Sequence, residues 1–125
     1  MKPDLMFGCL GNGLTVCDRA RQEDGDYKHV AHIDPCGAFK LFDKSLPPEA
    51  LQAINAHAIR LADGFRARFL RLREADALNE LYALMTPAQQ LAYTSEGGPD
   101  REYMYGLYIR FTCENHGYSM PRPSA

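Results

Sequence analysis

Apolar and polar residues alternate with a period of two through the first 45 positions, and turn residues interrupt the pattern. This alternation is typical of strands that bury one face. The Gly-Asn-Gly sequence at 11–13 predicts a hairpin tip between strands at 5–10 and 14–19, because type I′ turns need positive φ at both central residues. In that register Cys9 lies opposite Val16.

A second hairpin follows a polar loop at 22–26. Strands at 27–33 and 38–43 flank Asp-Pro-Cys-Gly at 34–37, where Asp, Pro and Gly hold their favoured turn positions. The predicted register joins two apolar pairs and one pair of opposite charge on one face: Val30 with Leu41, His32 with Phe39, and Lys28 with Asp43.

From residue 47 the apolar period changes to 3.6, after two prolines and Glu49 that suit a first helical turn. One stripe about 100° wide predicts a long helix packed on a core: Leu51, Ile54, Ala58, Leu61, Ala62, Phe65, Phe69 and Leu72. The next apolar set, from Leu78 to Met85, is rotated by more than about 100° from that stripe. A break near 73–76 is therefore expected, with Asp76 as a candidate N-cap.

Two further helices are predicted downstream. Thr86 and Gln89 form a capping box around Pro87, which begins a short helix at 87–93. Residues 101–115 have one apolar helical face, and Gly117 is expected to end the helix, although the aromatic and β-branched content of 103–112 also suits a strand. The tail from Met120 is expected to be poorly ordered.

These elements predict an α+β fold: a small antiparallel sheet of about four strands in two hairpins, then a long amphipathic helix and two or three shorter ones. We expect one domain over 1–125, with a hairpin region at 1–45, a helical region at 46–117 and a tail at 118–125.

Composition limits the classes of function. Hydrophobic residues make up 46% of the chain, enough for a core, and 14 Lys and Arg against 16 Asp and Glu give a net charge of −2. That balance argues against global attraction to nucleic acid or to an anionic membrane. No transmembrane stretch or signal peptide is evident, which predicts a cytoplasmic protein with four reduced cysteines. No cofactor or metal is expected.

Local patterns give the candidate binding residues. Five arginines flank the long apolar stripe and are candidates for gripping phosphates, although long cationic side chains commonly cover such a stripe with their stems: Arg60, Arg66, Arg68, Arg71 and Arg73. Tyr105 and Ile109 fall outside the main apolar face of the predicted helix at 101–115. They form either a second contact surface or a packing surface for a neighbouring helix.

Cys113 and His116 are one helical turn apart, a spacing that suits a metal pair or a thiol beside a base. A metal site needs further ligands, and a nucleophile needs an oxyanion hole, and the sequence places neither. A buried thiol and a histidine at the helix C-terminus is the favoured interpretation.

The sequence from Cys9 to Arg19, with Gly25 to Tyr27, Val30 to Asp34 and Leu46-Pro47, resembles small uncharacterised proteins encoded on conjugative and integrative elements of gut-associated bacteria. The resemblance covers about the first 50 residues and implies an accessory gene on a mobile element.

Together these features favour a non-enzymatic accessory protein that binds a protein partner, either a second copy of itself or a host or element protein. Two alternatives stay open: nucleic-acid binding through the arginine-flanked helix at 60–73, and a small thiol or metal enzyme that uses Cys113 and His116.

Overall fold

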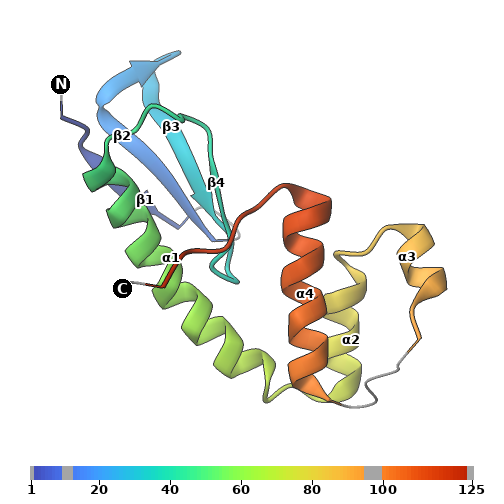
Figure 1. The fold of residues 1–125 in the computed structure, drawn as a ribbon. Helices are drawn as coiled ribbons and strands as arrows, with labels where there is room; N and C mark the ends of the chain where they lie inside the picture. The colour runs from blue at the N-terminus through green and yellow to red at the C-terminus, as the bar shows by residue number, and fades with distance from the viewer. Residues whose placement is uncertain (1, 10–12, 95–99, 124–125) are drawn as a thin grey trace.

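The computed structural model describes residues 2–9, 13–94 and 100–123, and it confirms the α+β class (Figure 1). Four strands precede four helices, in the order β1 (Leu5–Gly8), β2 (Leu14–Glu23), β3 (Asp26–Ile33), β4 (Phe39–Leu41), α1 (Pro48–Phe69), α2 (Glu74–Tyr82), α3 (Pro87–Ala92) and α4 (Arg101–His116). The sheet is antiparallel, with the strands side by side in chain order. Residues 101–116 are helical, which removes the strand alternative.

The first hairpin has a different register from the predicted one. Phe7 lies opposite Val16 and Gly8 opposite Thr15, so the predicted pairing of Cys9 with Val16 is wrong. The predicted tip at residues 11 and 12 lies outside the described part of the chain.

The predicted polar loop at 22–26 is in fact a tight hairpin between β2 and β3. Glu23 pairs with Asp26, and only Asp24 and Gly25 connect them, with φ of 53° and 85°. Two successive positive φ values are the signature of a type I′ turn, for which Asp-Gly is a favoured sequence. β2 therefore runs to Glu23 and pairs with β3.

The hairpin between β3 and β4 forms at the predicted turn but is shifted by one residue. Ala31 faces Leu41 and Ile33 faces Phe39, so the predicted pairs are wrong. The cause is Gly37, whose φ of 91° adds a left-handed residue after the turn while its N–H donates to the Asp34 carbonyl. A turn followed by such a residue makes a three-residue loop with a bulge.

One face of the sheet packs on the N-terminal half of α1 (Figure 1). Val16, Ala31 and Ile33 are fully buried there against Ile54 and Ala58. This arrangement satisfies the alternation of the strands and the helical period together. The buried line of α1 passes through Ala50 rather than Leu51, which the stripe had included.

The C-terminal half of α1 extends beyond the sheet and packs against α2 and α4 (Figure 1). Phe65 and Phe69 of α1 meet Ala77 of α2 and Met104 of α4 in this second cluster. A third cluster joins α2 to α4 through Leu81 and Phe111, with Met85 after α2. The apolar set from Leu78 to Met85 is rotated from the stripe of α1 because α2 buries its apolar face against α4.

The helix ends follow the predicted chemistry except at α2. Thr86 and Gln89 form the reciprocal capping box, and Gly117 ends α4 in the left-handed conformation with φ of 75°. The break after α1 falls at residues 70–73, so Arg73 is the N-cap of α2 and Asp76 lies in its first turn. Among the described residues, no helix combines the length and hydropathy that crossing a bilayer requires.

Candidate binding groove

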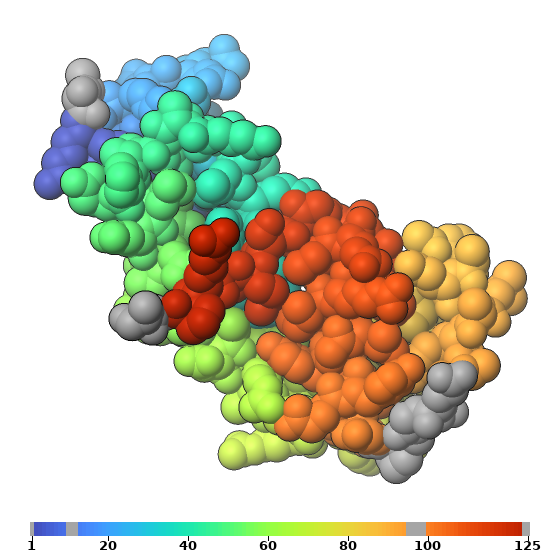
Figure 2. Space-filling view, in the orientation of Figure 1, coloured from blue at the N-terminus to red at the C-terminus, as the bar shows by residue number. Residues whose placement is uncertain are grey.

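A groove lies between β4, the N-terminal half of α1 and the C-terminal segment. Its volume is about 1290 Å³. In the space-filling view the dark red C-terminal segment crosses the green surface of α1 beside it (Figure 2). The lining residues are Phe39, Lys40, Leu41, Lys44, Leu51, Gln52, Ile54, Asn55, Ala56, Ile59, Gly117, Ser119, Met120, Arg122 and Pro123.

Apolar side chains from two elements line much of this groove. Leu51 and Ile59 lie on the side of α1 next to the buried line of the helix, and Leu51 remains 37% exposed. Leu41 and Phe39 of β4 are partly buried against the core and also border the groove. The one-residue shift of β4 matters here, because it places both side chains opposite Ala31 and Ile33 on the α1 side of the sheet.

The C-terminal segment forms the remaining wall, and its residues Ser119 and Arg122 are hydrogen-bonded to β4 and α1. Ser119 and Phe39 exchange two backbone hydrogen bonds of 2.8 and 2.9 Å. Farther along, the Asn55 side chain donates to the Arg122 carbonyl at 2.8 Å and accepts from the Arg122 N–H at 2.9 Å. This amide acts as an extra backbone unit that fixes the segment to α1.

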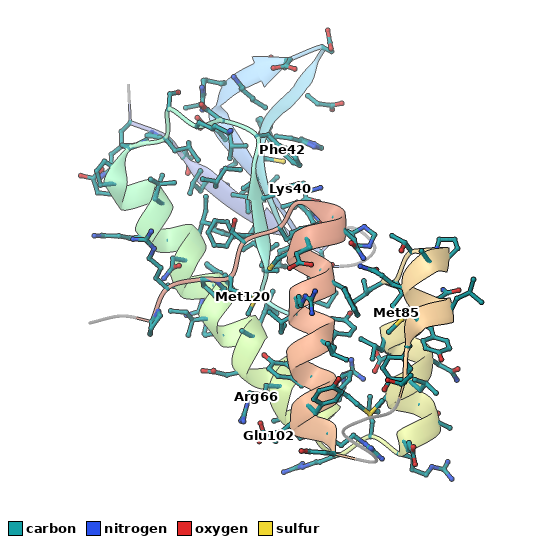
Figure 3. All side chains as sticks on the ribbon, turned by 45° about the vertical axis from the view of Figure 1, so that its right-hand side comes forward. Lys40, Phe42, Arg66, Met85, Glu102 and Met120 are labelled. Atoms are coloured by element: carbon teal, nitrogen blue, oxygen red, sulfur yellow. The ribbon has the colours of Figure 1, made fainter. Side chains whose placement is uncertain are left out.

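Three cations border the groove, and its lining contains no Asp or Glu. The Lys40 ammonium lies 4.6 Å from the centre of the Tyr118 ring, and Lys44 and Arg122 are exposed. None of the ion pairs within the described residues involves any of the three. Figure 3 shows Lys40 on β4 and Met120 on the C-terminal segment, on two walls of the groove.

The predicted arginines lie elsewhere, and most of them have partners. Arg66 forms a forked pair with Glu102 at 2.8 and 3.0 Å, visible in Figure 3. Arg68 pairs with Glu80 at 2.9 Å and Arg73 lies 3.8 Å from Asp76. Arg60 contacts the His57 ring at 3.0 Å. Carboxylates thus offset the charge of three of these side chains, which weakens the support for phosphate binding there.

Arg71 is exposed, and no ion pair within the described residues includes it. Tyr105 and Ile109 pack against the second core cluster, and the Tyr105 ring lies 6.3 Å from Phe65 and 6.0 Å from Phe69. Of the two interpretations of these positions, the structure supports packing against a neighbouring helix.

Cys113 and His116 both lie near the C-terminal end of α4. Cys113 is partly buried, and burial together with Glu114 raises the pKa of its thiol, which disfavours the nucleophilic thiolate. No group of three or more His, Cys, Asp or Glu side chains in the described ranges is placed to hold a metal ion. Cys36 is fully buried in the second cluster, and burial raises its pKa to about 12.

These environments predict the order in which the four free thiols react. Exposed Cys9 should react with a thiol reagent such as dithionitrobenzoate well before Cys113, and Cys17 and Cys36 only when the protein opens, because both are buried. Time-resolved modification followed by peptide mapping measures this order, with Cys9→Ser as the control that removes the fast phase. Reaction of Cys113 ahead of Cys9 would contradict this order and would support the alternative of a thiol enzyme.

A second polar site lies on the N-terminal side of the sheet, where Arg21 bridges two carboxylates. Its Nε donates to Asp18 at 2.7 Å and its Nη2 donates to Asp43 at 2.6 Å, beside a small cavity of about 200 Å³. The predicted pair of Lys28 with Asp43 is therefore replaced by Arg21 with Asp43. This follows from the shift of β4 and from an irregularity in β2 between Asp18 and Gln22.

Both carboxylates in this second site are held in the ionised form. Burial alone would raise the pKa of Asp18, but donors from the Asp4 backbone, Arg21 and the Ala20 backbone outweigh it and lower the pKa. The Ser45 hydroxyl and N–H, then Arg21, lower the pKa of Asp43. The lowered pKa values keep both carboxylates ionised at neutral pH, where they pair with the Arg21 guanidinium.

In comparisons with known proteins, no family model matches the chain, and neither a curated protein nor a solved structure matches it.

Sequence reasoning missed the groove residues altogether. Lys44 and Arg122 are isolated cations in the sequence, and Leu51 was assigned to the buried stripe. The one available hint was the small Ala50 next to Leu51. A small residue can take the core position on a closely packed helix and leave its larger neighbour exposed.

Proposed function

We propose that this protein is a non-enzymatic accessory module that binds a protein partner through the groove between β4, α1 and the C-terminal segment. The observation that carries the proposal is the composition of that groove: apolar walls bordered by three cations that form no ion pair among the described residues. Exposed apolar surface of this kind is typical of interaction sites.

The size and construction of the groove support a macromolecular partner. Pockets for small ligands usually measure about 300–1,000 Å³, and this groove measures about 1290 Å³. Its walls are held from three directions by the sheet, α1 and the bonded C-terminal segment, so it is preformed. Preformed surfaces reduce the entropic cost of binding. The resemblance of the first 50 residues supports a mobile-element setting for this role.

Panning a random-peptide display library against the protein tests this function. Leu51→Gln removes apolar surface from the groove, and Leu91→Gln, at a residue 91% exposed on α3, is the matched control for an apolar surface outside it. We expect peptides that bind the wild type and Leu91→Gln but bind Leu51→Gln at least about fivefold more weakly, the loss of roughly 1 kcal/mol of apolar contact. If every selected peptide binds the two variants equally, the groove is not a protein-binding site.

A further inference from the structure

The charge of the groove is unusual within this molecule. Elsewhere, several surface arginines lie beside acids, although Arg71 does not: Arg19 with Asp4, Arg66 with Glu102, Arg68 with Glu80 and Arg110 with Glu114. At the groove, Lys40 and Lys44 in and just after β4, and Arg122 on the C-terminal segment, belong to a lining that contains no carboxylate. The protein as a whole is acidic, with a net charge of −2, so this positive potential is local.

The positions of the three cations relative to the apolar walls define what the groove accepts. Lys40 lies in β4 and Lys44 just after it, whereas Arg122 lies on the C-terminal segment, which is hydrogen-bonded to β4 at Ser119 and to α1 at Arg122. Leu51, Ile59 and Met120 lie with them in the lining. A ligand that fills the groove therefore has apolar groups for the walls and negative charges for both rims. Such complementary charge also steers the encounter and selects the partner.

We infer that the occupant is an acidic segment of a partner protein, in which Leu, Ile or Phe side chains enter the groove and flanking Asp or Glu side chains meet Lys40, Lys44 and Arg122. This inference rests on the proposed function and names the class of partner. The described residues of this chain offer no comparable exposed segment. The one run that mixes leucine with several acids, in α2, buries Leu81 and pairs Glu80 with Arg68.

The experiment uses the peptides selected by display and asks what they share. Their sequences should be enriched in Asp and Glu as well as in large apolar residues, and depleted in Lys and Arg. For the tightest binder, replacing every Asp and Glu by Asn and Gln should weaken binding, measured by fluorescence anisotropy, by about tenfold or more. Raising the salt concentration should weaken the binding of the acidic peptide and leave the binding of its Asn and Gln version nearly unchanged.

Charge reversal in the protein provides the reciprocal test. Lys44→Glu with Arg122→Glu should weaken the acidic peptide by about tenfold or more, because two attractions become repulsions. Lys2→Glu with Arg71→Glu changes the net charge equally at exposed cations outside the groove lining and should leave binding within about twofold. Circular dichroism checks that both double variants keep the fold. The hydrogen bonds between Asn55 and residue 122 use the backbone of Arg122, so a change of its side chain does not remove their donor or acceptor.

Several outcomes separate this inference from the proposed function. If the selected peptides are neutral or basic and their binding depends on Leu51, the inference of an acidic partner is wrong and the proposed protein-binding function stands. A wild-type dimer in light scattering that dissociates in Leu51→Gln would assign the groove to a second copy and overturn the inference. Binding of oleate that is lost in the Lys44 and Arg122 double variant, with no peptide selected, would assign the groove to a fatty-acid anion and overturn both.

Discussion

Replacing Gly37 by alanine is expected to destabilise the protein by about 3 kcal/mol or more. Gly37 is buried with φ of 91°, and an added Cβ would lie 2.5 Å from the Ala62 Cβ and 2.6 Å from the Ala58 carbonyl oxygen. Two costs combine: the left-handed backbone conformation of a residue with a side chain, and the displacement of α1 from the turn. Urea unfolding followed by circular dichroism measures the loss as a lower midpoint.

Two other glycines separate these costs. Gly25 has φ of 85° and no atom within 4 Å of an added Cβ, so Gly25→Ala carries only the backbone cost of about 1 kcal/mol. Gly64 lies inside α1 with open space around it, so Gly64→Ala should stabilise the helix by up to about 1 kcal/mol. If Gly37→Ala loses no more than Gly25→Ala, the close approach of the turn to α1 does not determine the fold.

Gly37 also shows why the strand register could not be predicted from sequence. A two-residue turn and a three-residue loop with a bulge both suit Asp-Pro-Cys-Gly. They differ in whether Gly37 pairs with Asp34 as a strand residue or adopts the left-handed conformation and leaves that pairing to Ala38. The structure has the second form, with the Asp34 N–H donating to the Ala38 carbonyl. The choice depends on packing against Ala58 and Ala62, which come more than 20 residues later in the chain.

Other local features were readable from sequence, and one was overlooked. The capping box at Thr86 and the end of α4 at Gly117 depend on neighbouring residues alone, and both were predicted correctly. The Asp24-Gly25 turn depends equally on neighbours, and its dipeptide indicates a type I′ hairpin. It was missed because the polar residues around it were interpreted as a loop.

The candidate site could not be predicted, because its parts are distant in sequence. The groove exists only when residues 119–123 return to α1, and Asn55 holds Arg122 across 67 positions. The arginine cluster shows the converse. Its residues are close in sequence, but Glu102, 36 positions after Arg66, pairs with one of them in the fold. The pattern of arginines along α1 therefore overstated the unpaired positive charge on that helix. It gave no indication of the unpaired positive charge at the groove.

Removing the Asp18 carboxylate is the other change with a large expected effect. Asp18 is 1% exposed, and its Oδ1 accepts from the N–H groups of Asp4 and Ala20 at 3.0 and 2.9 Å, while its Oδ2 accepts from Arg21. Asp18→Ala leaves these donors without their acceptor and should cost about 3 kcal/mol. Asp18→Asn keeps Oδ1 for both backbone donors but sets an amide N–H against the Arg21 guanidinium, so it should cost less.

The same carboxylate predicts the dependence of stability on pH. The folded pKa values of Asp18 and Asp43 lie below the ordinary value of 3.8. A group whose pKa is lower in the folded state stabilises the fold above its unfolded pKa and loses that contribution as the pH falls through the folded pKa. Urea unfolding between pH 7 and pH 2 should therefore show that the free energy of unfolding of the wild type begins to fall near pH 4. Asp18→Asn should reduce the slope of this fall.

Asp4→Asn, at an exposed pair with Arg19, is the control and should change the free energy of unfolding by less than about 1 kcal/mol. An Asp18→Asn protein with the full wild-type slope would show that the Arg21 bridge does not couple protonation of Asp18 to folding.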